Sequence, residues 1–138
     1  MITNSNNEII RRHSKKRDEI RQALLGRTDH PTAEVIYQEL KQKDPSISLG
    51  TVYRNLMLLS ENGEIRTLNV GDGLVHFDPN VSTHAHFRCT RCGKVSDLEI
   101  DFLQRLSQPL NFKGKITSIS LLFSGVCEDC LNSVKKNN

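Results

Sequence analysis

Four cysteines arranged as two Cys-x-x-Cys pairs place the strongest restriction on how this chain can fold. The pairs are Cys89 with Cys92 and Cys127 with Cys130, and they account for every cysteine in the sequence. A Cys-x-x-Cys turn can direct two thiolates at one ion, and two such turns complete a tetrahedral shell. Residues 93–126 separate the pairs, a longer gap than the roughly 15–20 residues common in compact zinc motifs. The fold must therefore bring two distant turns together.

A structural zinc ion held by all four cysteines explains them better than the alternative, two unrelated buried or redox-active dithiols. A shell of four thiolates has no open coordination position, so it would serve stability rather than chemistry. No apolar run approaches the ~20 residues needed to cross a bilayer, and the start MITNSNNE has no apolar core of a signal peptide. These features predict a cytosolic protein, in which paired cysteines are more often metal ligands than disulfides.

Histidines and aspartates form a second candidate metal site. Its possible ligands are His30, Asp78, His84, His86 and Asp97. On a strand His84 and His86 face the same side, so both rings can approach one ion. Such a mixture of imidazoles and carboxylates suits Fe(II), Mn(II) or Zn(II). A His-x-His pair alone is more often two ordinary surface or core histidines, and the isolated His13 and His76 are interpreted in that way.

Three segments of the first half show the spacing of amphipathic helices. We expect residues 1–7 to form a disordered tail. The first predicted helix begins between residues 8 and 14 and ends at Gly26. The second, in HPTAEVIYQELKQK, has Pro31 near its start and is broken at Asp44-Pro45. The third, in SISLGTVYRNLMLLSENGEI, has Ser48 as its N-cap and a glycine, at position 63, suited to a left-handed C-terminal cap.

Shorter, strand-like runs follow the third helix. Two of them flank Gly71-Asp72-Gly73 and predict a β-hairpin. Three helices and a hairpin are the order of a winged helix, although a plain helical domain fits the local pattern nearly as well. Beyond Pro79 the runs HAHFRC, KVSDLEI and KITSISLLFSGVC predict further strands, with a short helix over Asp101–Ser107.

Positive charge is concentrated near the N-terminus. The net charge is only +3, but residues 1–27 carry seven Arg and Lys residues against three acidic ones. Charge alone favours a solvated helix face over a nucleic-acid-binding one.

Together these segments resemble the Fur family of metal-dependent repressors along nearly the full length of the chain. The matching stretches are HPTAEVIYQEL, SISLGTVYRNLMLLSENGEI, GDGLVHFD, HAHFRCTRCGKVSDL and GVCEDC. The resemblance implies an α+β fold with an N-terminal winged helix-turn-helix domain over residues 1–77. It also implies a hinge over residues 78–83, followed by an α/β dimerisation domain over residues 84–138. The second domain would carry the four-cysteine zinc site.

The resemblance also implies that the His/Asp set holds a regulatory Fe(II) or Mn(II) ion. Aspartate at position 97 is typical of the peroxide-sensing branch, in which Fe(II)-dependent oxidation of His30 or His84 would release DNA. The stretch SISLLFSGVC lacks the histidine of an additional site that iron and zinc sensors commonly keep. The alternatives are an iron-responsive or zinc-responsive repressor and, more distantly, a non-haem metalloenzyme or a zinc-ribbon interaction module. The sequence contains no nucleophile motif or glycine-rich phosphate loop, so we predict that the protein is not an enzyme.

For DNA, the resemblance implies a homodimer on an A/T-rich inverted repeat, with no membrane partner. The third helix would enter the major groove, where its residues Tyr53 and Arg54 reach bases, unless Tyr53 packs in the core instead. The first helix would place Arg12 in the minor groove and hold phosphates with the run Lys15, Lys16 and Arg17. Here SKKR departs from the Thr-x-Gln-Arg-like start of relatives and matches clearly only at Arg17.

Overall fold

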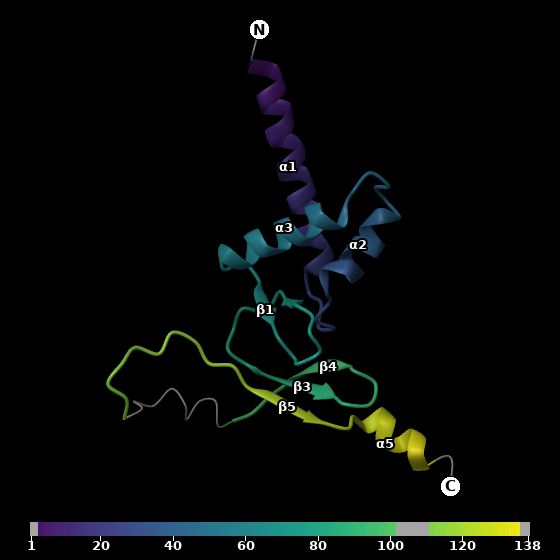
Figure 1. Ribbon diagram of the computed structural model, residues 1–138, viewed down its shortest axis with the longest axis vertical. Helices are drawn as coiled ribbons and strands as arrows, with labels where there is room; N and C mark the ends of the chain where they lie inside the picture. Colours follow the sequence, from purple (N-terminus) through teal and green to yellow (C-terminus); the bar gives the residue numbers. More distant parts are fainter. Residues whose placement is uncertain (1–2, 102–110, 136–138) are drawn as a thin grey trace. The chain divides into compact units, whose positions relative to one another are not determined.

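The structure, a computed structural model, describes residues 3–101 and 111–135. The chain divides into two compact units, Met1–Val81 and Ser82–Asn138, whose elements are drawn in Figure 1. The division lies within the segment 78–83, and Asp78 at its start is the last residue of a strand. In the described residues no helix combines the length and the apolar character needed to cross a membrane.

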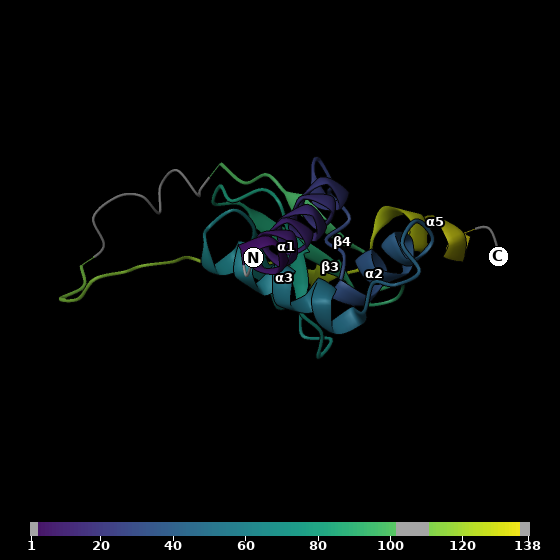
Figure 2. The ribbon, with the colours of Figure 1, turned by 90° about the horizontal axis from the view of Figure 1, so that it is seen from above.

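The first unit contains three helices and a two-stranded hairpin. The helices are α1 (Thr3–Leu24), α2 (Ala33–Lys41) and α3 (Leu49–Glu61), and the hairpin strands are β1 (Arg66–Leu68) and β2 (His76–Asp78). The strands are antiparallel. In Figures 1 and 2 α3 crosses beside the C-terminal part of α1, whose N-terminal part extends beyond the other helices. This order of elements is the one that the sequence predicted for a winged helix.

Apolar side chains from all three helices and the hairpin form the core of this unit. Its members are Ile20, Leu24, Ala33, Ile36, Ile47, Val52, Leu56, Leu59, Ile65 and Phe77. In α3 the buried apolar residues Val52, Leu56 and Leu59 recur at intervals of three and four, which place them on one face of the helix. Of the residues between them, Tyr53 and Arg54 are exposed.

Local capping fixes where the helices begin and end. The Ser48 side chain accepts a hydrogen bond from the backbone of Thr51 at the start of α3, which confirms the predicted N-cap. At the other end the Gly63 N–H donates to the Ser60 carbonyl and the Glu64 N–H to the Leu59 carbonyl. This pair of hydrogen bonds requires a residue in the left-handed conformation, and Gly63 supplies it with a φ of 76°.

The start of the first helix differs from the prediction, because α1 begins at Thr3 rather than between residues 8 and 14. The expectation of a disordered tail is therefore wrong for residues 3–7, and residues 1–2 lie outside the described residues. The stretch TNSNNE contains no glycine or proline, and adding residues to an existing helix is far easier than starting one. Weak polar helix formers can therefore continue a helix whose C-terminal part, with Ile20 and Leu24, is fixed in the core.

The second unit is built on a three-stranded sheet. Its strands are β3 (Ala85–Cys89), β4 (Val95–Leu98) and β5 (Leu122–Gly125), and α5 (Glu128–Lys135) follows them. The order is β4-β3-β5, with β4 antiparallel and β5 parallel to β3. The predicted run 115–127 forms a strand only over residues 122–125. The Leu121 carbonyl still accepts a hydrogen bond from the His86 N–H, whereas residues 115–120 are mostly exposed and belong to no strand. Residues 102–107 of the predicted short helix lie outside the described residues.

Candidate metal centres and nucleic-acid-binding face

The structure brings the four cysteines together within the second unit. Cys89 ends β3, and a turn closed by the Gly93 N–H on the Cys89 carbonyl brings Cys92 beside it. The second pair brackets the start of α5. The Sγ atoms of Cys89 and Cys130 lie 3.8 Å apart, as do those of Cys92 and Cys127, and all four lie within 4.8 Å of one another. No disulfide joins them.

The distances suit a tetrahedral ion. Four sulfurs about 2.3 Å from a zinc ion would stand about 3.8 Å from one another, because that is the edge of a tetrahedron of this size. Two of the observed separations, at 3.8 Å, match it, and the others are no longer than 4.8 Å. Two distant turns therefore present one closed set of soft ligands, which two unrelated dithiols would not do.

The protonation of the sulfurs shows why this cluster needs a cation. Backbone N–H groups of Cys92 and Cys127 point at the Cys89 sulfur, 3.5 and 3.4 Å away, and lower the pKa of Cys89 to about 5. The hydrogen bond with Cys127, followed by burial, raises the pKa of Cys130 to about 12. Cys89 is thus a ready thiolate, whereas Cys130 would lose its proton at neutral pH only beside a positive charge.

A group of nitrogen and oxygen ligands lies on β3 and β4 of the same unit. His86 is opposite Asp97 in the antiparallel register, and His84 stands two residues before His86. The Nε2 atoms of His84 and His86 lie 3.1 and 3.5 Å from one oxygen, Oδ1 of Asp97. The imidazole centroids are 4.3 Å apart. The alternation of side chains on a strand therefore directs both rings at one carboxylate, as the spacing predicted.

The tautomer of His84 is fixed by its backbone surroundings. Its Nδ1 lies 2.7 Å from the Ser82 carbonyl oxygen, which can only accept, so Nδ1 carries the proton. In the neutral ring the lone pair is then on Nε2, the atom 3.1 Å from Asp97 Oδ1. A ring held in this way is prepared to bind a metal ion through Nε2.

The first unit contributes a separate pair. His30 and Asp78 are both buried, and His30 Nε2 lies 3.4 Å from Asp78 Oδ2. Asp78 is held at the end of β2, and its other oxygen accepts a hydrogen bond from the Asn80 N–H. A buried imidazole and carboxylate at this distance can serve as ligands for a divalent ion.

Sequence reasoning missed two residues next to this pair, His76 and Asp72. The ring of His76 reaches the backbone of His30 through Nδ1 and the carboxylate of Asp72 through Nε2. The sequence did contain a signal, because His76 precedes Asp78 by two residues and alternate residues of a strand share a face. His76 is therefore a buried core histidine, as one of the two sequence interpretations had it, and both of its ring nitrogens make polar contacts.

Comparison with known proteins identifies the family of the chain. Residues 9–123 match the Ferric uptake regulator family. The chain belongs to this family. The peroxide-responsive repressor PerR of Staphylococcus epidermidis is 34% identical over 122 residues, which cover 86% of this chain and 81% of the relative. The PerR protein of Staphylococcus aureus is likewise 34% identical over 122 residues, with 86% and 82% covered.

Solved structures agree with the family assignment. The peroxide stress regulator of Campylobacter jejuni is 28% identical with a TM-score of 0.65, covering 89% of this chain and 97% of its own. The ferric uptake regulator Fur of Helicobacter pylori has a TM-score of 0.74 at 23% identity, with 85% and 80% covered. The second likeness shows the fold alone, and both agree with the predicted α+β architecture.

In this Fur-family chain the side of α3 opposite the core is the candidate face for DNA. Tyr53 is 44% exposed, so it does not pack in the core, and Arg54 is exposed beside it. The Arg54 guanidinium lies 3.5 Å from the Thr51 hydroxyl, one turn nearer the N-terminus of α3. These two side chains project from the part of the helix that meets bases in winged-helix proteins.

The basic residues of α1 differ in their surroundings. Arg12 and Lys15 are exposed, and Lys16 is half-buried. Arg17 is also half-buried, and its Nε donates to the Asn55 side chain at 3.4 Å. The exposed members can reach a phosphate directly, whereas Arg17 also connects α1 to α3.

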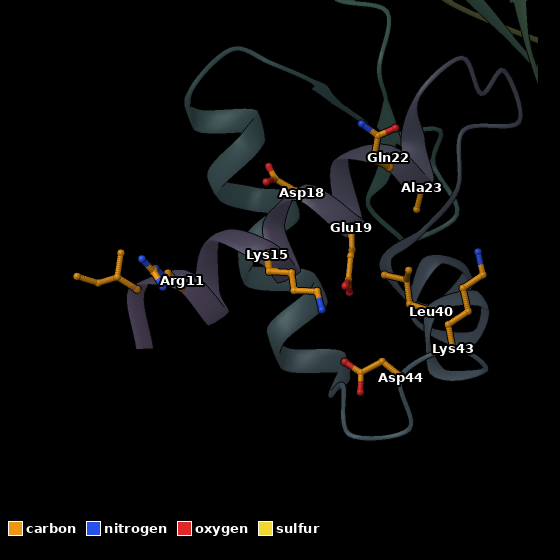
Figure 3. A pocket seen from close by; sticks show the side chains of 10 residues that line it. Arg11, Lys15, Asp18, Glu19, Gln22, Ala23, Leu40, Lys43 and Asp44 are labelled. Atoms are coloured by element: carbon orange, nitrogen blue, oxygen red, sulfur yellow. The ribbon is translucent and has the colours of Figure 1, made fainter. Parts of the chain in front are cut away.

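A cavity of about 760 Å³ lies between the middle and C-terminal part of α1 and the end of α2 in the first unit (Figure 3). Its walls include Ile10, Arg11, Lys15, Asp18, Glu19, Gln22, Ala23, Leu40, Lys43 and Asp44. Figure 3 shows Lys15 and Glu19 on α1 extending toward the space near Asp44. The wall has three basic and three acidic residues. The cavity therefore favours neither an anionic nor a cationic ligand.

Proposed function

We propose that this protein is a metal-dependent, DNA-binding repressor that responds to peroxide. The observation that carries the proposal is the convergence of His84 and His86 on Asp97, in a Fur-family chain that is 34% identical to peroxide-responsive repressors. Repression would require the metal-bound form, and peroxide would relieve it.

The cysteine cluster would hold a structural zinc ion. Its four sulfurs are soft ligands at tetrahedral separations, and they come from the two ends of residues 89–130. Because four thiolates fill the coordination shell, this ion would stabilise the second unit without binding a further ligand. Thiolate ligands stay reduced in the cytosol, so we place the protein there.

The regulatory ion would be Fe(II) or Mn(II), with His30, Asp78, His84, His86 and Asp97 as its ligands. Neutral imidazoles and two carboxylates would balance the charge of a divalent ion, and this donor set suits either metal. His30 and Asp78 belong to the first unit and the other three to the second. An ion bound by both groups would stabilise one arrangement of the two units, which would shift the population toward the form that binds DNA.

Bound Fe(II) would supply the redox chemistry that transfers an oxygen atom from peroxide to a ligand imidazole, while Mn(II) would not. His30 and His84 are the candidate rings. The Ser82 carbonyl holds the His84 ring with Nε2 toward Asp97, so the ring stays close to where the ion binds. An oxidised imidazole would be a poorer ligand, the metal would be lost, and the DNA-binding arrangement would no longer be favoured.

DNA recognition would use α3 and the basic residues of α1. Arg54 could bind guanine and Tyr53 could contact thymine methyl groups, each for roughly 1–3 kcal/mol. Arg12 would enter an A/T-rich minor groove, and Lys15, Lys16 and Arg17 would contact phosphates. A homodimer would present two such helices to an inverted repeat. Exposed apolar residues of the second unit, Phe112, Ile116, Leu122, Phe123 and Leu131, support dimerisation there.

Anaerobic fluorescence anisotropy on an A/T-rich inverted repeat tests the proposal. We expect binding with either Fe(II) or Mn(II) and loss of binding after one equivalent of peroxide with Fe(II) only. Mass spectrometry should then find one added oxygen atom on the peptide containing His30 or His84. As a matched control, His13→Gln changes an exposed histidine of α1 that lies outside the ligand set and should leave the peroxide response unchanged.

Other outcomes separate this proposal from its rivals. Binding that survives peroxide with both metals would contradict peroxide sensing and leave an iron-responsive or zinc-responsive repressor. Failure to bind any member of a broad set of A/T-rich inverted repeats, with either metal, would contradict DNA-binding repression itself.

A further inference from the structure

His76 connects two parts of the first unit that lie far apart in the sequence. It is buried on β2, and both of its ring nitrogens make short contacts. Nδ1 lies 2.7 Å from the His30 carbonyl oxygen and donates to it, because a carbonyl can only accept. Nε2 lies 2.6 Å from Asp72 Oδ2. The ring therefore joins the loop that carries His30 to the connection between β1 and β2.

Asp72 fixes the other end of this chain of contacts. It lies between Gly71 and Gly73, which both have positive φ, in the turn of the hairpin. While Oδ2 contacts His76, Oδ1 accepts a hydrogen bond from the Leu74 N–H at 3.0 Å. A single carboxylate thus ties the turn backbone to the imidazole, so the shape of the turn determines where the His76 ring stands.

His30 is the residue that most needs such support. Its φ of 53° is left-handed, a conformation that is unfavourable for a non-glycine residue. The loop around it is held to β2 by the His76 contact, by the Phe77 N–H on the Pro31 carbonyl at 2.9 Å, and by a bridge between Thr32 and His76. This backbone conformation places His30 Nε2 3.4 Å from Asp78 Oδ2.

We propose that His76 and Asp72 are positioning residues for the regulatory metal site. They orient His30 through its backbone carbonyl, so the turn of the β1–β2 hairpin contributes to metal affinity although it supplies no ligand. The inference rests on the proposed function of His30 as a ligand. Outer contacts of this kind typically change metal affinity by 10-fold to 100-fold. Here the effect should lie near the lower end, since His76 holds the backbone of the ligand and not its ring.

Mn(II) binding by zinc-loaded protein tests the inference, with free Mn(II) measured by electron paramagnetic resonance. His76→Leu keeps most of the volume of the ring but removes both polar contacts, and it should weaken Mn(II) binding by about tenfold. His76→Asn places an amide nitrogen where Nδ1 stood, so it can still donate to the His30 carbonyl and should recover most of the affinity. Asp72→Ala should fall between wild type and His76→Leu.

A control variant distinguishes positioning from general destabilisation. Val70→Ala truncates a buried residue of the same hairpin connection and leaves the His76 contacts in place. It should lower the thermal unfolding temperature at least as much as His76→Leu while Mn(II) affinity stays near that of wild type. Zinc content should remain constant throughout, because the cysteines lie in the other unit.

The opposite results overturn the inference in distinguishable ways. Equal loss of Mn(II) affinity in Val70→Ala and His76→Leu, or no recovery in His76→Asn, would show that only packing matters. Unchanged affinity in His76→Leu would show that His30 needs no such support. If wild type and His30→Ala bind Mn(II) equally, His30 is not a ligand, and the proposed regulatory site itself fails.

Discussion

The two units of this chain reach a defined structure by different means. In the first, ten apolar residues from the helices and the hairpin form one core. In the described part of the second, the buried hydrophobic residues are Ala85, Cys89 and Val95, and one of these is itself part of the sulfur cluster. The first unit can therefore be stable through burial alone, whereas the second needs further interactions.

We propose that those interactions are a bound metal ion and a dimer contact. Four sulfurs crowd within 4.8 Å of one another, an arrangement that needs a cation to be stable as thiolates. Apolar side chains such as Leu122 and Phe123 remain exposed on β5. A small domain with little core gains most of its stability from a metal or a partner. The difference implies that metal removal and dimer disruption should act on the second unit and spare the first.

Loss of one cysteine should have the largest effect. Cys127→Ser removes one ligand of the proposed zinc ion, and zinc contributes on the order of 10 kcal/mol to folding in small structural sites. We expect the variant to lose bound zinc and the amide protection of β3 and β5, while helix signals of the first unit persist. Zinc analysis and hydrogen exchange by NMR would measure both.

The neighbouring substitution Glu128→Gln controls for this change, because the exposed Glu128 lies outside the sulfur cluster. It should keep both zinc and the exchange protection. If Cys127→Ser keeps a full equivalent of zinc, the four-sulfur site is not the metal site that we propose.

A core truncation in the first unit should show the reverse pattern. Leu56 is fully buried on α3, and removing such a side chain to alanine costs about 2–5 kcal/mol. Leu56→Ala should therefore lower the free energy of unfolding of the helical unit, followed by circular dichroism in urea. Zinc content should be unchanged. Leu49→Ala, at a half-exposed position of the same helix, should change that free energy by no more than ~0.5 kcal/mol.

Loss of zinc from Leu56→Ala would contradict the separation of the two units. It would mean that the sulfur cluster depends on the core of residues 1–81, and the contrast between the units would no longer hold.

Disruption of the proposed dimer should be weaker. Phe123→Lys replaces an exposed aromatic residue of β5, and burying a side chain of this size in an interface contributes about 1.5–3 kcal/mol. We expect the dimer dissociation constant, measured by analytical ultracentrifugation, to rise at least tenfold. Ser124→Lys adds the same charge on the same strand without removing apolar area, and it should have a smaller effect. Equal effects from both would mean that charge, not apolar burial, controls association.

How much the sequence could predict also differs between the units. Periodicity and capping residues locate α3 to the residue, because Ser48 and Gly63 act through their own backbone neighbours. The start of α1 could not be read in this way, since polar residues with weak preferences follow whatever a neighbouring helix does. A helix end that is set by a capping residue can therefore be predicted from the sequence. A helix end that depends on how far an existing helix extends into polar residues cannot.

The candidate sites show the same limit. The spacing of His84 and His86 predicts a shared face, and the paired cysteines predict a cluster, because both rest on short-range geometry. The alternation of His76 with Asp78 was visible, but the proposed role of His76 could not be derived from it, because that role depends on a contact with His30, which lies 46 positions away in the chain. Only the fold brings that carbonyl to the ring.

The smallest predicted effect concerns an ion-pair group on the surface of the first unit. The Arg27 guanidinium donates to both oxygens of Asp29, at 2.8 and 2.6 Å, and to Glu39 at 2.6 Å. The hydrogen bonds from Arg27 hold the pKa of Asp29 below its ordinary value. Because the folded pKa lies below the unfolded one, the contribution to stability is present above the unfolded pKa and is lost as pH falls through the folded pKa.

Arg27→Met tests this contribution. The Asp29 side chain is 57% exposed, so solvent screening limits the loss at neutral pH to roughly 0.5–1 kcal/mol. Urea unfolding of the helical unit, repeated from pH 7 to pH 3, should show the difference between wild type and variant shrinking below about pH 4, where the unfolded carboxyl takes up its proton. A difference independent of pH would mean that packing of the Arg27 stem, not its charge, stabilises this surface. Zinc binding by the second unit should be unchanged in either case. The Arg27 contacts supplement the hydrophobic core of the first unit, whereas the second unit depends on its cysteine cluster.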